Sequence, residues 1–241
     1  MRNGNAAAEH ERACAQVARR YGELWLRFYV GRKLRSDPIF TTAFGLLGES
    51  RETLIDVGCG VGLLPFYLRE RGFRAPIVGL DRDGRKIARA REAVGRAGYR
   101  DLEFVEENAT EISERRGNIV LFDLLHYLPP DEQARLLERL VPRLAPGGML
   151  VIRDCPRDDN ARFWLTYLAE RFAQTTTWIV AAPLHFPTRE LIFSPFPPNE
   201  FSRSVEPLWG RTPFNNHLFI FRRRAAAAVP AAEARSDTFL A

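Results

Sequence analysis

The sequence predicts an α/β fold in which a mostly parallel sheet is covered by helices. Three observations predict it. Short apolar runs alternate with helical patterns through the centre of the chain, five strand signals fall at the spacing of strand–helix–strand units, and two more strand-like runs follow them. The 241 residues suffice for one such domain with its own core.

Five compact apolar runs are the expected parallel strands: TLIDV (53–57), PIVGLD (76–81), LEFVEE (102–107), NIVLFDL (118–124) and MLVIRD (149–154). Two later runs, FSRSVEPLW (201–209) and HLFIFRR (217–223), are joined by a stretch rich in turn residues. We expect these two runs to add strands to the same sheet.

Helical patterns separate the strands. LLPFYLRERG (63–72) ends at Gly72, a typical helix stop. A later pattern begins near Pro130, and Pro142 should end it early. Another helix is expected from Asn160 to Gln174. Between the second and third strands one apolar helix face is formed by Ile87, Ala90, Val94 and Ala97.

The chain divides into three parts. Residues 1–44 are expected to be an N-terminal helical segment, with one or two helices from His10 to Phe44. Residues 45–224 would be the sheet domain, with a lid-like insertion at about 155–200. Residues 225–241, and the first residues up to about Ala8, lack a core pattern and are expected to be disordered or to form a loose helix.

Composition and cysteine spacing narrow the classes of function. No apolar run reaches the roughly 18 residues of a membrane span, and the N-terminus carries charges where a signal peptide needs an apolar stretch. We therefore expect a cytoplasmic protein. Cys14, Cys59 and Cys155 show neither metal-binding nor redox spacing, and no metal site is expected.

The net charge of +5 raises the question of nucleic acid. Most arginines alternate with acids, as in DEQARLLERL, which is typical of a solvated helix face. Two denser basic patches remain, at 82–100 and 222–224. A nucleic-acid partner is not expected, although an RNA substrate stays open as a minor alternative.

A glycine-rich loop follows the first strand. The run LIDVGCGVG (54–62) places three glycines between a strand and a helix, where glycine permits a sharp turn and close approach of a ligand. Asp56 precedes them, and Asp81 ends the second strand. An acid at the place of Asp81 can accept hydrogen bonds from the two hydroxyls of an adenosine ribose.

A nicotinamide or flavin dinucleotide is the main alternative ligand for this loop. Its fingerprint is G-x-G-x-x-G, whereas here the third glycine comes one position earlier and Leu63 stands where that pattern has glycine. Asp56 would repel a pyrophosphate but suits the cationic amino group of S-adenosylmethionine (SAM). The spacing therefore favours SAM.

Taken together, IDVGCGVG, GLD, VEENAT and the run 118–154 resemble the class I SAM-dependent methyltransferase family over roughly residues 50–155. This resemblance implies a Rossmann-like, seven-stranded, mostly parallel sheet with helices on both faces and, at HLFIFRR, an antiparallel last strand. KLRSDPIF and GRTPFNNHLFIFRR also resemble bacterial small-molecule methyltransferases associated with aryl-polyene-type pathways.

The resemblance also implies a set of cofactor-binding residues. The glycine loop would line the methionine and ribose part of SAM, and Asp81 would bind the ribose. Asn108 stands where the family commonly has an acid beside the adenine, and its side-chain oxygen can still accept that hydrogen bond. The full expected set is Asp56, Gly58, Cys59, Gly60, Gly62, Asp81, Arg82, Asn108, Ala109, Asp123 and Leu124.

Methyl transfer asks the protein to align the reactants, exclude water and sometimes remove a proton. His126, just past the fourth strand, is the candidate catalytic base because its intrinsic pKa suits proton removal near neutral pH. The alternative is that it packs against the sheet or the cofactor. Lys33 either meets the SAM carboxylate or lies on the surface.

Aromatic residues are dense in the later part of the chain and form either a lid over an apolar or aromatic acceptor or ordinary core: Phe163, Trp164, Tyr167, Trp178, Phe186, Phe193 and Phe196. We predict a SAM-dependent methyltransferase acting on a small, apolar or aromatic molecule. Methylation of RNA or protein, and a non-catalytic SAM-binding role, are the alternatives. The acceptor, the atom methylated and the oligomeric state stay open.

Overall fold

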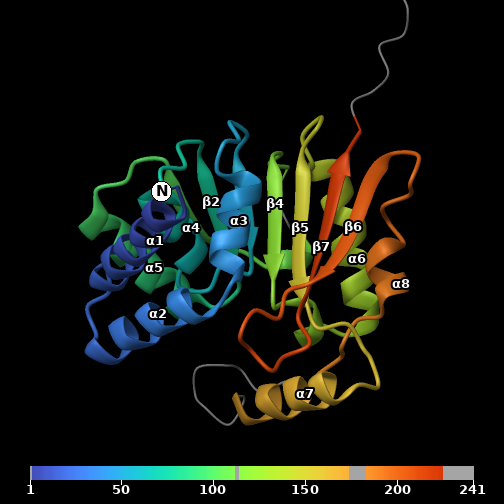
Figure 1. The fold of residues 1–241 in the computed structure, drawn as a ribbon. Coiled ribbons are helices and arrows are strands. Elements are labelled where there is room, and N and C mark those ends of the chain that lie inside the picture. Colours follow the sequence, from blue (N-terminus) through green and yellow to red (C-terminus); the bar gives the residue numbers. More distant parts are fainter. Residues whose placement is uncertain (1, 112–113, 174–182, 225–241) are drawn as a thin grey trace, which may run out of the picture.

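The computed structural model describes residues 2–111, 114–173 and 183–224 (Figure 1). Its centre is a seven-stranded sheet in the order β3-β2-β1-β4-β5-β7-β6. Neighbours among β1 to β5 pair in parallel, and β7 runs antiparallel to both β5 and β6. The strands are β1 (Leu54–Val57), β2 (Ile77–Asp81), β3 (Leu102–Glu106), β4 (Asn118–Phe122), β5 (Met149–Asp154), β6 (Phe201–Pro207) and β7 (His217–Arg223). The predicted mostly parallel sheet with an antiparallel last strand is confirmed.

The helices surround this sheet on both faces. They are α1 (Arg2–Arg19), α2 (Leu24–Ser36), α3 (Ile39–Leu47), α4 (Leu63–Glu70), α5 (Gly84–Ala97), α6 (Pro130–Leu140), α7 (Ala161–Ala173) and α8 (Arg189–Phe193). Three short 3-10 turns join them, η1 (Ala109–Glu111), η2 (Leu125–Tyr127) and η3 (Val141–Arg143). As predicted, α6 stops just before Pro142, because proline cannot continue the backbone hydrogen bonding.

Side chains of each strand point alternately into two apolar layers. One layer joins the sheet to α1–α5 and includes Leu54, Ile77, Val120, Met149 and Val151. The other joins it to α6 and α8 and includes Ile55, Val78, Leu121, Leu150 and Ile152. Because both faces of β1, β2, β4 and β5 are buried, these strands read as nearly continuous apolar runs in the sequence.

The N-terminal segment differs from the prediction. One or two helices were expected between His10 and Phe44, but three helices precede β1. The first residues, expected to be disordered or a loose helix, belong to α1, which begins at Arg2. The alanines at 6–8 are strong helix formers, and Asn5 Nδ2 donates to Glu9 Oε1 at 2.9 Å. Pro38 separates α2 from α3.

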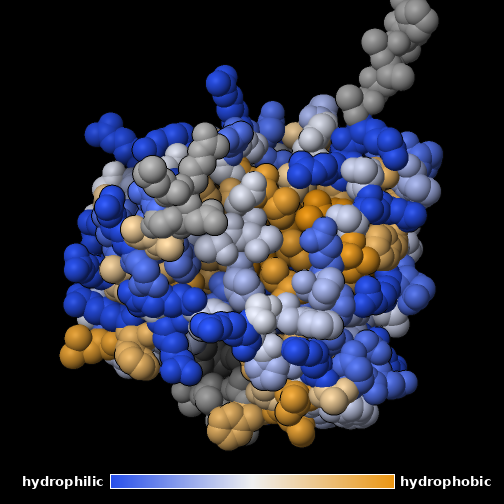
Figure 2. All heavy atoms as spheres, viewed as in Figure 1, coloured by the Kyte–Doolittle hydropathy of each residue, from blue (hydrophilic) through white to orange (hydrophobic). Residues whose placement is uncertain are grey.

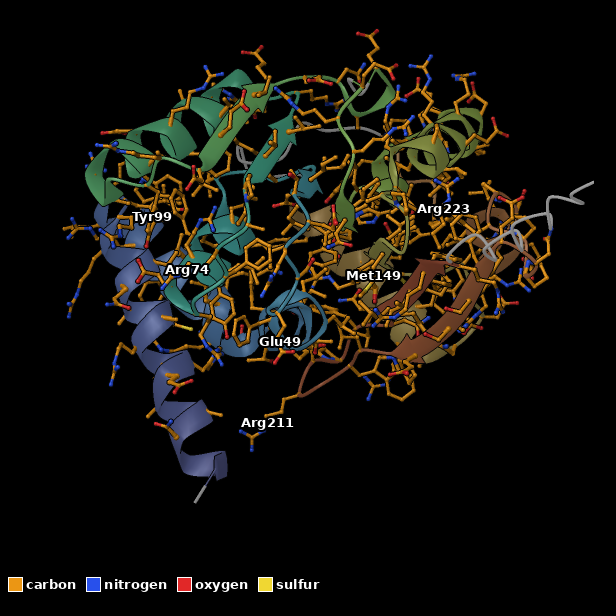
Figure 3. The ribbon with its side chains drawn as sticks, turned by 90° about the horizontal axis from the view of Figure 1, so that it is seen from above. Glu49, Arg74, Tyr99, Met149, Arg211 and Arg223 are labelled. Carbon is orange, nitrogen blue, oxygen red and sulfur yellow. The ribbon has the colours of Figure 1, made fainter. Side chains whose placement is uncertain are left out.

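Tyr99 and Arg20 anchor the end of α1 to the sheet domain. Both bind the carboxylate of Glu70 at the end of α4, through the Tyr99 hydroxyl at 2.6 Å and Arg20 Nη2 at 2.8 Å. Figure 3 shows Tyr99 beside α1. These buried and half-buried contacts hold α1 against the domain, which the residue pattern of α1 alone did not predict.

The predicted tail at 225–241 lies outside the described residues, and so does part of the insertion, 174–182. Among the helices that are described, none is both long and apolar enough to cross a membrane.

Candidate functional site

A cavity of ≈ 370 Å³ lies at the carboxyl ends of the parallel strands. Its wall combines the loop after β1, the ends of β2, β4 and β5, the turn after β3, and residues of α2, α3 and α7. In open parallel sheets this edge is where ligands bind, because neighbouring connections leave it on opposite sides.

The loop after β1 is shaped by three left-handed glycines. Gly58, Gly60 and Gly62 have φ values of +79°, +58° and +85°. The Gly58 amide donates to the Leu80 carbonyl at 2.8 Å, which ties the loop to β2. A Cβ on Gly60 would meet no heavy atom within 4 Å, whereas one on Gly62 would lie 2.5 Å from Phe104 Cζ. Gly60 therefore leaves room for a ligand, and Gly62 leaves room for the core.

Asp81 fixes the same loop from the end of β2. Its Oδ2 accepts from the Gly60 amide at 2.8 Å, and its Oδ1 accepts from the Asp83 amide at 2.9 Å. Each carboxylate oxygen has a further lone pair, so Asp81 can accept additional hydrogen bonds from a ligand in the cavity.

Asp56 lies at the end of β1 beneath the loop and is only 4% exposed. Burial, and then the nearby charge of Asp81, raises the pKa of Asp56 to about 8. The carboxyl group is therefore largely protonated at neutral pH, and a cation placed beside it would favour its ionised form.

Arg153 is the buried cation at the end of β5. Its guanidinium binds Asp37, with Nη1 2.6 Å from each carboxylate oxygen, and also Asp123, with Nε 2.9 Å from Oδ1. Lys33 Nζ joins the cluster 2.9 Å from Asp37 Oδ2. Burial opposes the ionisation of Asp37, but Arg153 and Lys33 outweigh it and hold the pKa of Asp37 well below its usual range.

Asp123 lines the same wall and has a strained backbone conformation. It is the one described non-glycine residue with positive φ, at +52°, a conformation that costs most side chains about 1 kcal/mol. Its ion pair with Arg153 and the bond from its amide to the Arg153 carbonyl, at 2.9 Å, hold it there. Such local strain is typical of functional sites.

His126 lies behind the cavity wall and is 3% exposed. Its Nδ1 is 2.8 Å from Oδ1 of Asp154. That carboxylate also accepts from the Cys155 amide at Oδ1 and from the Leu125 amide at Oδ2. Burial lowers the pKa of His126, but Asp154 raises it by more, to about 9. The ring is therefore a cation at neutral pH with Nδ1 donating, and its Nε2 is buried without a hydrogen-bond partner among the described residues.

Tyr127 and Glu170 form the wall in front of His126. The Tyr127 hydroxyl donates to Glu170 Oε2 at 2.6 Å, and the same oxygen lies 3.9 Å from His126 Nε2. Burial and then Glu170 raise the pKa of Tyr127 well above its usual range, so the phenol keeps its proton. Both residues line the cavity.

The structure brings most of the predicted cofactor residues into one wall. All of them except Gly62 line the cavity, and His126 does not line it either. Lys33, which was expected either to meet SAM or to lie on the surface, lines the cavity. Sequence reasoning missed the contributions of Tyr29, Phe40, Glu107, Tyr127, Arg153 and Glu170. An arginine in the otherwise apolar run MLVIRD was the signal for Arg153.

The aromatic residues of the later segment divide between two roles. Phe163, Tyr167 and Phe186 pack near His126, and the Phe186 ring stacks on it with centroids 5.4 Å apart. Phe193 and Phe196 instead pack against β7 in the core. Trp178 lies outside the described residues. Within the described ranges, no cluster of His, Cys, Asp and Glu could hold a metal ion.

Known proteins share this fold, and a family of known sequences matches part of the chain. Residues 54–148 match the family described as "Methyltransferase domain". Magnesium protoporphyrin IX methyltransferase from Synechocystis PCC 6803 has a TM-score of 0.60 at 17% identity, over 85% of this chain and 91% of that one. The pyocyanin biosynthetic protein PhzM has a TM-score of 0.61 at 20% identity, over 82% of this chain and 57% of that one. We call residues 54–148 the methyltransferase domain, after the family that they match.

The methyltransferase domain has relatives with a different named activity. The carboxy-S-adenosyl-L-methionine synthase of Chromohalobacter salexigens is 31% identical over 144 residues, 54% of this chain and 53% of that protein. The chain thus spans about half the length of the curated relatives it matches. Every predicted cofactor residue lies inside the methyltransferase domain, whereas Lys33, Arg153 and Glu170 lie outside the matched residues.

Proposed function

We propose that this chain is a SAM-dependent methyltransferase whose acceptor is a small molecule. The observation that carries the proposal is the left-handed glycine loop with Asp56 and Asp81 beside it, at the carboxyl edge of a parallel sheet. Each of these features suits one part of SAM, and together they form a continuous wall of the cavity.

The residues present fit this cofactor. The open space beside Gly60 admits a ligand against the backbone. Asp56 would face the cationic amino group, and Asp81 would accept hydrogen bonds from the ribose. The adenine would lie near Arg82, Asn108 and Ala109, and the methionine part near Asp123 and Leu124, which all line the cavity.

Bound SAM supplies a methyl group on a sulfonium, which leaves readily, so the chain must mainly align the acceptor and exclude water. We infer that the acceptor binds where η2 and α7 meet the cavity, and we call this part the acceptor end. Its polar groups are Tyr127 and Glu170. We propose that α7 and the described residues 183–200 act as the lid predicted from the sequence, whereas residues 174–182 lie outside the described part.

We propose that Glu170, rather than the predicted His126, acts directly on the acceptor, and that His126 supports Glu170 from behind. Glu170 would take the proton that an acceptor hydroxyl or amine loses as its bond to the methyl carbon forms. His126, held by Asp154, would orient Glu170 and keep its charge balanced, because its Nε2 lies 3.9 Å from Glu170 Oε2. A histidine that is already protonated at rest is poorly suited to accept that proton directly.

Phe163, Tyr167 and Phe186 support an apolar or aromatic acceptor, because they gather next to this end of the cavity. We place the reaction in the cytoplasm, as the sequence predicts. RNA or protein methylation, and a non-catalytic SAM-binding role, remain the alternatives to be excluded by experiment.

Formation of a carboxylated SAM is a second candidate. The carboxy-S-adenosyl-L-methionine synthases among the relatives favour it, and so do two cationic side chains in the wall, Lys33 and Arg153, which would suit an extra carboxylate. Both cations are already paired with Asp37, which leaves methyl transfer as the first choice.

The test is incubation of the full chain with SAM labelled in its methyl group and an extract of its source cells. We expect label in the small-molecule fraction, with S-adenosylhomocysteine (SAH) as co-product. Label in RNA or protein would contradict the acceptor class. SAH binding without any label transfer would indicate a non-catalytic protein, and a heavier, carboxylated SAM would establish the second candidate.

The residues at the acceptor end need a separate comparison once an acceptor is found. Glu170→Gln should lower kcat with little change in SAH affinity. His126→Gln should change the pH profile of kcat as well as its size, because His126 acts through Glu170. A variant that loses SAH binding instead would contradict its place at the acceptor end.

A further inference from the structure

The large exposed hydrophobic side chains of the described residues all lie on α2 and α7. Their exposed fractions run from 39% to 79%. We call them the apolar rim: Leu24, Trp25, Phe28, Tyr29, Trp164, Leu165, Leu168 and Phe172. Globular proteins rarely gather large apolar side chains on one part of their surface unless that part binds something.

The helix α2 is apolar on two faces. Its inner face packs Leu26, Val30 and Leu34 into the core. Its outer face presents Leu24 and Phe28, one helical turn apart, with exposed fractions of 79% and 73%. An amphipathic surface helix needs only the inner stripe to fold, so the outer apolar residues serve no packing of α2 onto the sheet.

The helix α7 repeats this arrangement. Phe163 and Thr166 are buried on its inner face, while Leu168, 62% exposed, lies on its outer face one turn after Trp164. Two helices far apart in sequence therefore carry the same kind of outer surface.

The two helices flank the cavity. Tyr29 and Lys33 of α2 and Glu170 of α7 line its wall. In Figure 1 both helices lie at the carboxyl edge of the sheet, and Figure 2 shows hydrophobic side chains over each of them at the lower edge of the molecule. The apolar rim is therefore grouped around the entrance to the candidate site.

Positive charge accompanies the apolar rim. The sequence of α2, LWLRFYVGRKLRS, holds four basic residues and no acidic one. In α7 the single acid, Glu170, faces the cavity. Arg27, Arg32 and Arg171 are exposed, and none of them takes part in an ion pair with the described residues.

We propose that the apolar rim is a membrane-binding surface that docks the protein on a bilayer containing anionic phospholipid. Leu, Phe and Trp side chains next to arginines are the composition of helices that lie in the plane of a bilayer interface. The apolar side chains enter the boundary of the acyl chains, and the arginines bind the negative headgroups. Docked in this way, the cavity opens towards the bilayer, and an apolar ligand reaches it without crossing water.

Binding of the full chain to lipid vesicles tests this directly. One set of vesicles is phosphatidylcholine alone, and another contains about one quarter phosphatidylglycerol. We expect the wild type to float with the anionic vesicles and less with the neutral ones. Phe28→Ser combined with Leu168→Ser should weaken that binding by about tenfold or more. Both side chains are mostly exposed, and thermal unfolding checks that the variant is folded.

Three further variants separate the apolar from the electrostatic contribution to binding. Phe28→Leu with Leu168→Met keeps the apolar character and should keep the binding. Arg135→Ser removes an exposed arginine of α6, away from the apolar rim, and should have no effect, whereas Arg27→Ser with Arg32→Ser should weaken binding to anionic vesicles only.

Three results would overturn the proposal. One is a folded wild type that does not float with either set of vesicles. A second is flotation that the serine variant retains in full. A third is light scattering that reveals a dimer which these serine substitutions dissociate, because the apolar rim would then join two copies of the chain. SAH binding is measured on the same samples, so failure of the proposed cofactor binding would be seen separately from failure to bind the vesicles.

Discussion

Arg153 of β5 binds both carboxylate oxygens of Asp37, at 2.6 Å, and thereby joins the sheet to the junction between α2 and α3. The two residues are 116 positions apart in the sequence, the pair is buried, and Arg153 lines the cavity. The N-terminal helices are thus fixed to the candidate site by charge as well as by apolar packing.

Removing the guanidinium of Arg153 should greatly lower the free energy of unfolding. Arg153→Met would leave Asp37 and Asp123 buried or half-buried without their main partner, and we expect a loss of about 3–5 kcal/mol in the free energy of unfolding. Arg135→Met, which breaks the exposed pair with Asp131, should cost less than about 1 kcal/mol. Urea unfolding of both variants checks this, and equal losses would contradict the structural role of Arg153.

Alanine substitutions at Gly62 and Gly95 should change the stability of the fold in opposite directions, because the two glycines have different surroundings. Gly62 has φ +85° and a Cβ there would lie 2.5 Å from Phe104, so Gly62→Ala should destabilise the fold by roughly 1–3 kcal/mol. Gly95, inside α5, has open space around it, and Gly95→Ala should stabilise the fold by about 0.5–1 kcal/mol. Thermal unfolding measures both, and a neutral Gly62→Ala would argue against the loop geometry.

His126 should make stability depend on pH. Its pKa is about 9 in the folded state, against 6.5 for the unfolded chain, so the folded state binds this proton more tightly. The resulting stability is fully present below pH 6.5 and is lost as the pH rises through about 9. Over that window, His126→Gln should show a smaller fall in the free energy of unfolding than the wild type. If the free energy of unfolding depended on pH in the same way in the variant and the wild type, His126 would be neutral in the folded state.

Asp56 should couple ligand binding to proton release. Its pKa of about 8 keeps it mostly protonated at pH 7, and the cationic amino group of SAH would favour the ionised form. SAH affinity should therefore rise with pH up to about 8 and then level, and Asp56→Asn should remove this rise. Calorimetry in two buffers of different protonation enthalpy counts the protons, and binding without proton release would place the amino group elsewhere.

The parts of the fold that depend on local pattern were predictable. The five parallel strands gave apolar runs with turn residues at their ends, and all of them lie within two residues of the expected bounds. The glycines and Asp81 were also predictable, because their role follows from backbone geometry at one place in the chain. The three N-terminal helices were harder, since α1 is held by distant residues such as Glu70.

The acceptor end of the site was not predictable for a related reason. His126, Asp154 and Glu170 are separated by long stretches of sequence. The pairing of β4 with β5 brings Asp154 to His126, and the packing of α7 against η2 adds Glu170. The sequence indicated His126 but not that Tyr127 and Glu170 stand between it and the cavity. Arg153 was likewise visible as a charge in a buried strand, while its pairing with Asp37 was not.

Calorimetric binding of SAH to the wild type and to Asp81→Ala tests the central claim most directly, with Asp101→Ala, an exposed acid at the amino end of β3, as the control. If the cavity holds SAM through its ribose, Asp81→Ala should lose at least about tenfold in affinity, or about 1.4 kcal/mol, and Asp101→Ala should lose none. A folded wild type that does not bind SAH, or an Asp81→Ala variant that binds it as tightly, would contradict the account.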